Sequence, residues 1–318
     1  MRKFSSLAVF GCVVALSLVV VGCAQIAELR AKMAFREANT LYASENWVEA
    51  AEKYEEVLAF NPTDPQLLTA YFFLGNSYDN QYSPGRVGDS VNDALLTNAI
   101  DNYRKAADAL VETPEMRTLS LQYLVAAYGS DKLNDPDQAM PLLQEMILEI
   151  PDNAPNYFML SRLYEDVGDY ENAEATLLAG REARPNDASI YTTLAAYYDR
   201  QGNFDSLIET LEARTAREPN NPEAHYTIAT YYFNKASRDF SLSDAEKVTY
   251  ADAGLVAVDK AIALNENYME ALVFKNLFLR LQANLDSSPA RQEALLEEAD
   301  EIAARAEELR LEKAAGLL

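Results

Sequence analysis

Three side chains in this sequence belong to the two types, thiol and imidazole, whose ordinary pKa values lie closest to neutral pH: Cys12, Cys23 and His225. A thiolate can attack, be acylated or ligate a metal, and an imidazole can move a proton or ligate a metal. No cysteine follows Cys23, so the later part of the chain has no thiol for a disulfide or a zinc site. The sequence therefore predicts neither thiol catalysis nor redox switching after residue 23.

Motifs that would support catalysis or cofactor binding are also absent. The sequence contains no H-E-x-x-H, no G-x-S-x-G, no P-loop and no G-x-G-x-x-G. Asp199, Gln201, Asn203 and Asp205 resemble the start of a calcium loop, but the required glycine and closing glutamate are missing. We interpret them as a turn between helices, and we expect no enzymatic activity, no metal and no cofactor.

The surroundings of Cys23 indicate export. Arg2 and Lys3 precede an almost wholly apolar run over residues 4–21. A short positive head followed by an apolar run is typical of a secretory signal. The run is also nearly long enough to span a bilayer, so an uncleaved membrane anchor is an alternative.

The four residues Val20-Val21-Gly22-Cys23 resemble the bacterial lipobox. This resemblance implies that the sulfur of Cys23 is acylated and that the chain is cut just before it. Residues 1–22 would then be a lipoprotein signal peptide, and residues 23–30 a short linker to the folded part. Cys12 would leave a much shorter apolar run, so we interpret it as a residue inside the signal. A plain anchor or an ordinary secreted protein remains the alternative.

Charge restricts the possible partners. The chain has 27 Lys and Arg against 50 Asp and Glu, a formal net charge of −23. Such a surface repels phosphate backbones, so nucleic acid is a poor partner. It also disfavours lying on anionic lipid, and we expect membrane attachment through the lipid anchor only. With 49% hydrophobic residues and only 11 glycines, the composition favours a packed helical protein.

A repeat organises the middle of the chain. Pro151, Pro185 and Pro219 follow one another at spacings of 34 residues, and the same landmarks recur before each. Apolar residues at i, i+3 and i+7 indicate one face of a helix, and a glycine then breaks the helix. The landmarks are Tyr157, Leu160, Tyr164, Gly168, Ala173 and Leu177 in one repeat, and Tyr191, Leu194, Tyr198, Gly202, Leu207 and Leu211 in the next.

This 34-residue pattern resembles the tetratricopeptide repeat family over at least residues 31–271. The resemblance implies an all-α, right-handed α-solenoid of antiparallel helix pairs. We expect six good repeats and one degraded repeat over residues 31–286, with a C-terminal capping helix over residues 287–318. His225 stands where sister repeats carry Tyr157 and Tyr191, so we interpret it as a packing residue.

Two repeats carry insertions, which we expect to be mostly helical. Ser243 and Glu246 form a capping-box pattern, so a long helix should begin near Asp244. A weaker start of the same kind lies at residues 90–93. We expect only residues 79–89 and about 240–242 to be irregular.

The resemblance also implies where partners bind. In the family, the first helix of each repeat lines a concave groove, and the matching positions here are rich in aromatic side chains, which favours binding of apolar side chains. The alternative for each aromatic residue is packing on the neighbouring repeat. The expected groove residues are Phe35, Asn39, Tyr42, Phe72, Phe73, Asn76, Phe158, Arg162, Tyr226 and Thr230.

Asn39 and Asn76 occupy the family position at which an asparagine commonly holds the backbone of a bound peptide. An amide offers a donor and an acceptor, which suits a peptide bond. We expect Asn76 to face the groove near Asn39 and Tyr78 to be buried on the other side of the helix. Substituting both asparagines should then weaken partner binding and leave stability nearly unchanged.

These observations predict a lipid-anchored scaffold or adaptor in a bacterial cell envelope. It should face the periplasm and bind other envelope proteins or peptide segments. We expect its lipid to be anchored in the outer membrane in preference to the inner membrane. An assembly factor for outer-membrane or type IV pilus machinery is an alternative, since both use lipoproteins of similar layout. A cell-wall glycan-binding or glycan-processing protein is a further alternative from a different class. Fold alone does not choose among them.

Overall fold

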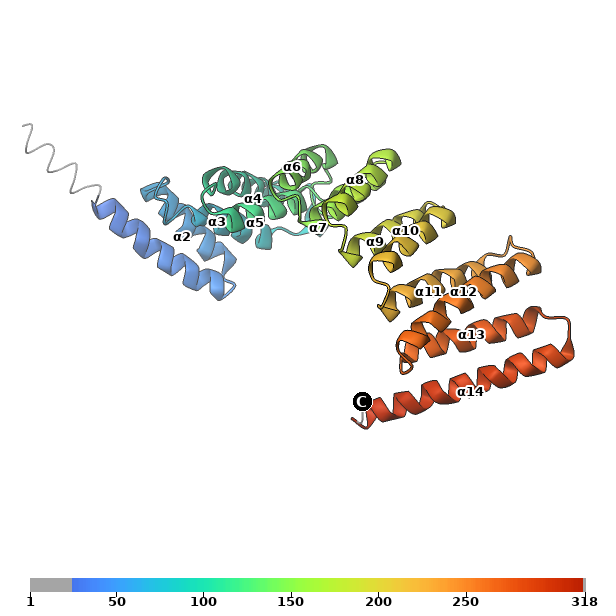
Figure 1. Ribbon diagram of the computed structural model, residues 1–318. Helices are drawn as coiled ribbons and strands as arrows, with labels where there is room; N and C mark the ends of the chain where they lie inside the picture. The colour runs from blue at the N-terminus through green and yellow to red at the C-terminus, as the bar shows by residue number, and fades with distance from the viewer. Residues whose placement is uncertain (1–24, 317–318) are drawn as a thin grey trace, which may run out of the picture. The chain divides into compact units, whose positions relative to one another are not determined.

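Helices form every regular element of residues 25–316, the part of the chain that this computed structural model describes, and no strand occurs there. The elements divide into two units, Met1–Asp169 and Tyr170–Leu318. Within each unit, helices that are neighbours in sequence lie against one another (Figure 1). The expected all-α array of helix pairs is confirmed. Cys12 and Cys23 lie outside the described residues.

The first described helix of the first unit covers residues 25–43. Residues 25–30 were expected to be linker, and they are instead the first turns of this helix. The remaining elements of the unit are α2 (Trp47–Phe60), α3 (Thr69–Gln81), the 3₁₀ turn η1 (Pro84–Arg86), α4 (Ser90–Ala109), α5 (Pro114–Ala127), α6 (Pro136–Glu149) and α7 (Ala154–Asp166).

The second unit ends with a long helix that starts at Pro289, directly after Ser288, and lies against the helix before it (Figure 1). It covers the last helix of the array, as the expected capping helix should. The elements of this unit are α8 (Tyr170–Ala183), α9 (Ala188–Arg200), α10 (Phe204–Arg217), α11 (Pro222–Arg238), α12 (Asp244–Leu264), α13 (Met269–Leu285) and α14 (Pro289–Ala314).

The recurring landmarks of the sequence have local structural causes. Gly168 and Gly202 adopt φ of 80° and 69° after α7 and α9, a backbone conformation that glycine adopts at low cost. The Tyr157 hydroxyl donates to the carbonyl of Pro151 at 2.9 Å, and the Tyr191 hydroxyl donates to that of Pro185 at 2.8 Å. The tyrosine at the start of a repeat therefore holds the loop that closes the preceding one.

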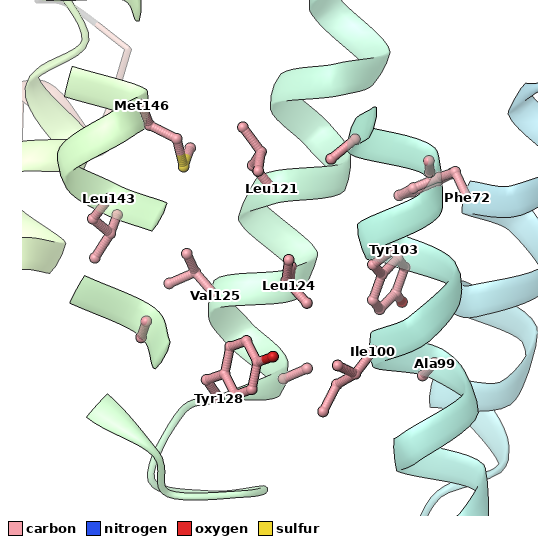
Figure 2. Packing of buried hydrophobic residues seen from close by; sticks show 14 of the residues in the cluster. Phe72, Ala99, Ile100, Tyr103, Leu121, Leu124, Val125, Tyr128, Leu143 and Met146 are labelled. Carbon is pink, nitrogen blue, oxygen red and sulfur yellow. The ribbon is translucent and has the colours of Figure 1, made fainter. Parts of the chain in front are cut away.

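The core of the first unit lies between consecutive helices. Leu121, Leu124 and Val125 of α5 point into the space between α4 and α6 (Figure 2). Tyr103 of α4 and Leu143 of α6 contribute from either side, and both are fully buried. Truncating one such leucine to alanine would cost about 2–5 kcal/mol, because it removes apolar contacts and leaves a cavity.

Helices α12 and α13 approach closely at Gly254. A Cβ atom at this position would overlap the ring of Phe278, which is fully buried in the core of the second unit. The glycine thus makes room for a large aromatic side chain. The helix-propensity penalty of about 1 kcal/mol for glycine is offset by the burial of that ring.

The two insertions are ordered, as expected. Ser243 and Glu246 form the complete capping box, and α12 begins at Asp244. The Asp89 side chain accepts hydrogen bonds from the backbone N–H groups of Val91 and Asn92 at the start of α4. The irregular segments differ slightly from the expectation, because α3 extends to Gln81 and residues 239–243 join α11 to α12.

Candidate partner-binding pocket

Most of the expected groove residues of the first two repeats come together in one cluster of rings. Tyr42 lies edge-on to Phe73, with ring centroids 5.0 Å apart, and Phe35 lies edge-on to Tyr54 at 6.1 Å. Phe72 contacts Phe73 at 5.3 Å, and it is only 3% exposed. The expectation that Phe72 offers its side chain to a partner is therefore wrong. It packs on the neighbouring helices, which was the alternative for these aromatic residues.

Asn76 differs most from the expectation. Its side chain is 5% exposed and lies inside the unit. The Tyr42 hydroxyl donates to Asn76 Oδ1 at 2.6 Å, and Asn76 Nδ2 donates to the Tyr103 hydroxyl at 3.2 Å. The Asn80 amide also donates to Asn76 Oδ1. These internal bonds occupy both ends of the amide, so the expected free amide at Asn76 is wrong.

Asn39 and Tyr78 differ from the expectation in part. Asn39 is exposed, but its Oδ1 accepts a 2.7 Å hydrogen bond from the fully buried Tyr54. Tyr78 was expected to be buried and is only half-buried, because its hydroxyl reaches outward to donate to Glu55. Neighbouring helices therefore cover the face of α3 that carries Phe72 and Asn76. That face is not an open groove.

The hydrogen bonds of Asn76 continue as a chain through the unit. The Tyr103 hydroxyl donates to Asp79 Oδ2 at 3.1 Å, and Lys132 Nζ donates to Asp79 Oδ1 at 2.5 Å. Burial and then the Asp79 carboxylate hold the pKa of the Tyr103 hydroxyl far above its ordinary value. The hydroxyl therefore stays protonated and acts as a donor. This chain joins Tyr42 to the loop between α5 and α6.

That loop forms one wall of a pocket within the first unit. The pocket has a volume of about 530 Å³, within the range of about 300–1,000 Å³ that is usual for ligand sites. Helix α5 contributes Val125 and Ala126, and α6 contributes Leu143. The remaining lining residues are Gly129, Ser130, Asp131 and Lys132 of the loop and Phe158, Met159, Arg162 and Leu163 of α7.

Backbone hydrogen bonds fix the loop wall. The carbonyl of Gly129 accepts from the N–H groups of Lys132 and Asn134, at 3.0 and 2.9 Å. Asn134 has φ of 53°, in the left-handed region that asparagine tolerates better than most residues. Asp135 then caps the start of α6, where Pro136 occupies the first helical turn. These backbone hydrogen bonds fix the position of the Lys132 backbone beside the pocket.

The pocket combines an apolar floor with charged groups. Val125 and Leu143 are buried core residues, and the Phe158 ring is half-buried. Lys132 is paired with Asp79, and the exposed Arg162 pairs with Asp166 through Nε at 3.1 Å. Asp131 adds one carboxylate. Two of the lining residues are thus cations, in a chain whose net charge is −23.

Two of the expected groove residues, Phe158 and Arg162, line this pocket together. The expected residues of the sixth repeat lie in the second unit. Tyr226 is half-buried against Tyr268 and Phe274, with centroids 5.2 and 5.3 Å away. The Thr230 hydroxyl donates to the backbone of its own helix, at the carbonyl of Thr227.

The sequence interpretation missed Val125, Ala126 and Lys132 as pocket residues. Gly129 and Asn134 are turn signals, so the position of the loop was open to prediction. Lys132 pairs with Asp79, which is 53 residues away, and no local sequence pattern predicts that contact.

Within residues 25–316, no group of three or more His, Cys, Asp or Glu side chains is placed to hold a metal ion. In the same range, none of the helices combines the length and apolar character needed to cross a membrane.

Comparison with known proteins identifies part of the repeat region. Residues 132–197 match the family model of the tetratricopeptide repeat. No curated protein matches the chain. The matched segment begins at the pocket residue Lys132 and runs into α9.

Several solved structures match parts of this chain. A crystal structure of MamA is 18% identical, with 57% of this chain and 92% of that chain covered and a TM-score of 0.39. YrrB, described as a tetratricopeptide repeat protein with an unusual peptide-binding site, is 21% identical, with 59% and 86% covered and a TM-score of 0.38. A tetratricopeptide repeat protein from Parabacteroides merdae is 14% identical, with 88% and 97% covered and a TM-score of 0.45.

Proposed function

We propose that this protein is a scaffold that holds a segment of a partner protein in the pocket between α5 and α7. The observation that carries this proposal is the pocket itself, with an apolar floor, a volume of about 530 Å³ and two cationic lining residues. It lies in the stretch where the tetratricopeptide repeat match begins. Concave sites of this kind commonly bind through an apolar anchor and a few placed polar groups.

The lining selects the chemistry of the bound segment. Leu143, Val125 and Phe158 favour an aliphatic or aromatic side chain. The Arg162 guanidinium has five donors, of which Nε faces Asp166, and so it can also bind a carboxylate on the partner. We propose a segment with an apolar anchor next to an acidic residue. The carboxylate of such a segment would bind the free donors of Arg162, because the chain as a whole is strongly negative and gives no long-range attraction.

We further propose that the scaffold works in a bacterial cell envelope, attached through a lipid on Cys23. The lipobox resemblance at Val20-Val21-Gly22-Cys23 supports this proposal. A role in assembling outer-membrane or pilus machinery is a finer form of the same proposal. Intact-mass analysis of the N-terminal residue tests the anchor. A mature chain that begins at Cys23 without a lipid would contradict it.

The pocket proposal is tested by filling the pocket. Ala126 lines it and is exposed, so Ala126→Trp should occlude the space without disturbing the core. Ala59→Trp is the matched control, since Ala59 is exposed on α2 and lies outside the pocket lining. In proximity crosslinking within the native envelope, Ala126→Trp should lose partners that Ala59→Trp retains. Identical partner sets in both variants would refute binding at this pocket.

A further inference from the structure

The helix over residues 25–43 has a packed inner face. Ala31, Ala34 and Ala38 are buried and share a core with Tyr54 of α2 and Leu74 of α3. Their spacing of three and four residues places them on one side of the helix. The outer side is thereby left to residues that do not contribute to this core.

Large apolar side chains occupy that outer side. Ile26, Leu29 and Met33 are 56%, 61% and 64% exposed, and the same spacing aligns them along the helix. They span about 10 Å at 1.5 Å per residue. An aligned row of three exposed large apolar side chains is a candidate interaction surface.

The charge around this row differs from that of the whole chain. Residues 25–36 contain three cations, Arg30, Lys32 and Arg36, and one carboxylate, Glu28. Lys32 pairs with Glu28 at 2.6 Å, and the Arg30 guanidinium lies over the Phe60 ring at 5.8 Å. Arg36 is exposed one turn beyond Met33. The segment is therefore net positive, although the chain has a net charge of −23.

The position of this face along the chain indicates what covers it. Ile26 comes three residues after Cys23 and soon after the apolar run at residues 4–21. Three residues extend at most about 10 Å. Any attachment of Cys23 or of the apolar run to a bilayer therefore brings Ile26 to the lipid surface.

We propose that the outer face of this helix lies on the bilayer surface. Ile26, Leu29 and Met33 enter the boundary between headgroups and acyl chains, and the neighbouring cations face anionic headgroups. This inference rests on the proposed membrane attachment and adds a second contact, made by the protein itself. It replaces the expectation of contact through the lipid anchor only, because the charge of the whole chain does not describe this segment.

The test uses the full chain on vesicles of phosphatidylcholine and phosphatidylglycerol that carry a photoactivatable acyl chain. Mass spectrometry then maps the lipid adducts. Adducts should concentrate on residues 26–33 and be absent from Leu148 and Phe240, which are 82% and 91% exposed. The triple variant Ile26→Ser, Leu29→Ser, Met33→Ser should lose the adducts while keeping its helical content. The control triple Val111→Ser, Leu148→Ser, Val256→Ser, also at exposed positions, should keep them.

The outcomes separate this face from the anchor. A chain that sediments with the vesicles but gains no adduct on residues 26–33 overturns this inference and leaves the anchor standing. Crosslinks between two copies through these residues, without lipid adducts, overturn it in favour of a dimer. A chain that does not sediment with the vesicles overturns both. An absent lipid on Cys23 with adducts retained on the helix overturns the anchor alone.

Discussion

Asn76 connects two tyrosine hydroxyls that belong to different helices, and this arrangement makes it a structural residue. Asn76→Ala would leave the Tyr42 hydroxyl without its acceptor, whereas the Tyr103 hydroxyl would lose one bond and keep the one that it donates to Asp79. An unsatisfied buried group costs about 1–3 kcal/mol, so we expect a loss of unfolding free energy of that size in urea denaturation. Asn234→Ala is the matched control, because Asn234 is exposed on α11. That control should be neutral or slightly stabilising. Equal effects from both substitutions would show that the hydrogen bonds add nothing.

His225 makes stability depend on pH. Burial holds the pKa of its imidazole below the ordinary value and Lys260 acts in the same direction, although the contact with the Pro219 carbonyl opposes them. The unfolded chain therefore binds more protons than the folded chain as pH falls through the ordinary histidine range near 6.5. The contribution of His225 to stability is present above that range and is lost on acidification.

The sister repeats supply the variant that tests this pH dependence. His225 Nε2 lies 3.4 Å from the carbonyl of Pro219, where Tyr157 and Tyr191 place a donating hydroxyl. His225→Tyr should restore the repeat contact and flatten the change in melting temperature between about pH 7 and 5. Because the chain has one histidine, an unchanged slope would assign the pH dependence to carboxylates instead.

At the scale of the element, helix starts are set by local chemistry. The Ser243 side chain accepts from the Glu246 backbone N–H and completes a capping box, whereas Ser288 at the start of α14 makes no such bond. Ser243→Ala should lower the free energy of unfolding by about 0.5–2 kcal/mol. Ser288→Ala should have a much smaller effect. Hydrogen exchange in the first turns of α12 and α14 measures the difference, and equal fraying would contradict it.

The same local chemistry decides how much of the molecule could be predicted from its sequence. The break at Gly202, the start of α12 at Asp244 and the long last helix each depend on residues within a few positions. Those features were predicted. The burial of Phe72 and Asn76 was not, because it depends on Tyr103 and Tyr123 of later helices. The family position of Asn76 indicated an amide free to bind a partner. In the structure, the Tyr42 hydroxyl, 34 residues earlier, donates to that amide instead.

The pocket illustrates the same limit for a site. Phe158 and Arg162 were predicted from their positions in the repeat, and both line it. Lys132 also lines the pocket and pairs with the Asp79 carboxylate, and that contact joins elements of different repeats. A periodic pattern identifies which face of one helix is apolar. It does not identify which polar groups meet when several helices pack.

For the whole molecule, the proposed function requires that a partner segment enters the pocket between α5 and α7. Met159 lines this pocket and is 37% exposed, so a photoactivatable amino acid there should crosslink the bound segment in living cells. The same probe at Val256 of α12, which is 72% exposed, reports random encounters. We predict a specific adduct at position 159 that is absent at position 256 and disappears when Ala126→Trp fills the pocket. Adducts that are the same at both positions, or that persist in the filled pocket, would contradict binding of a partner segment at this pocket.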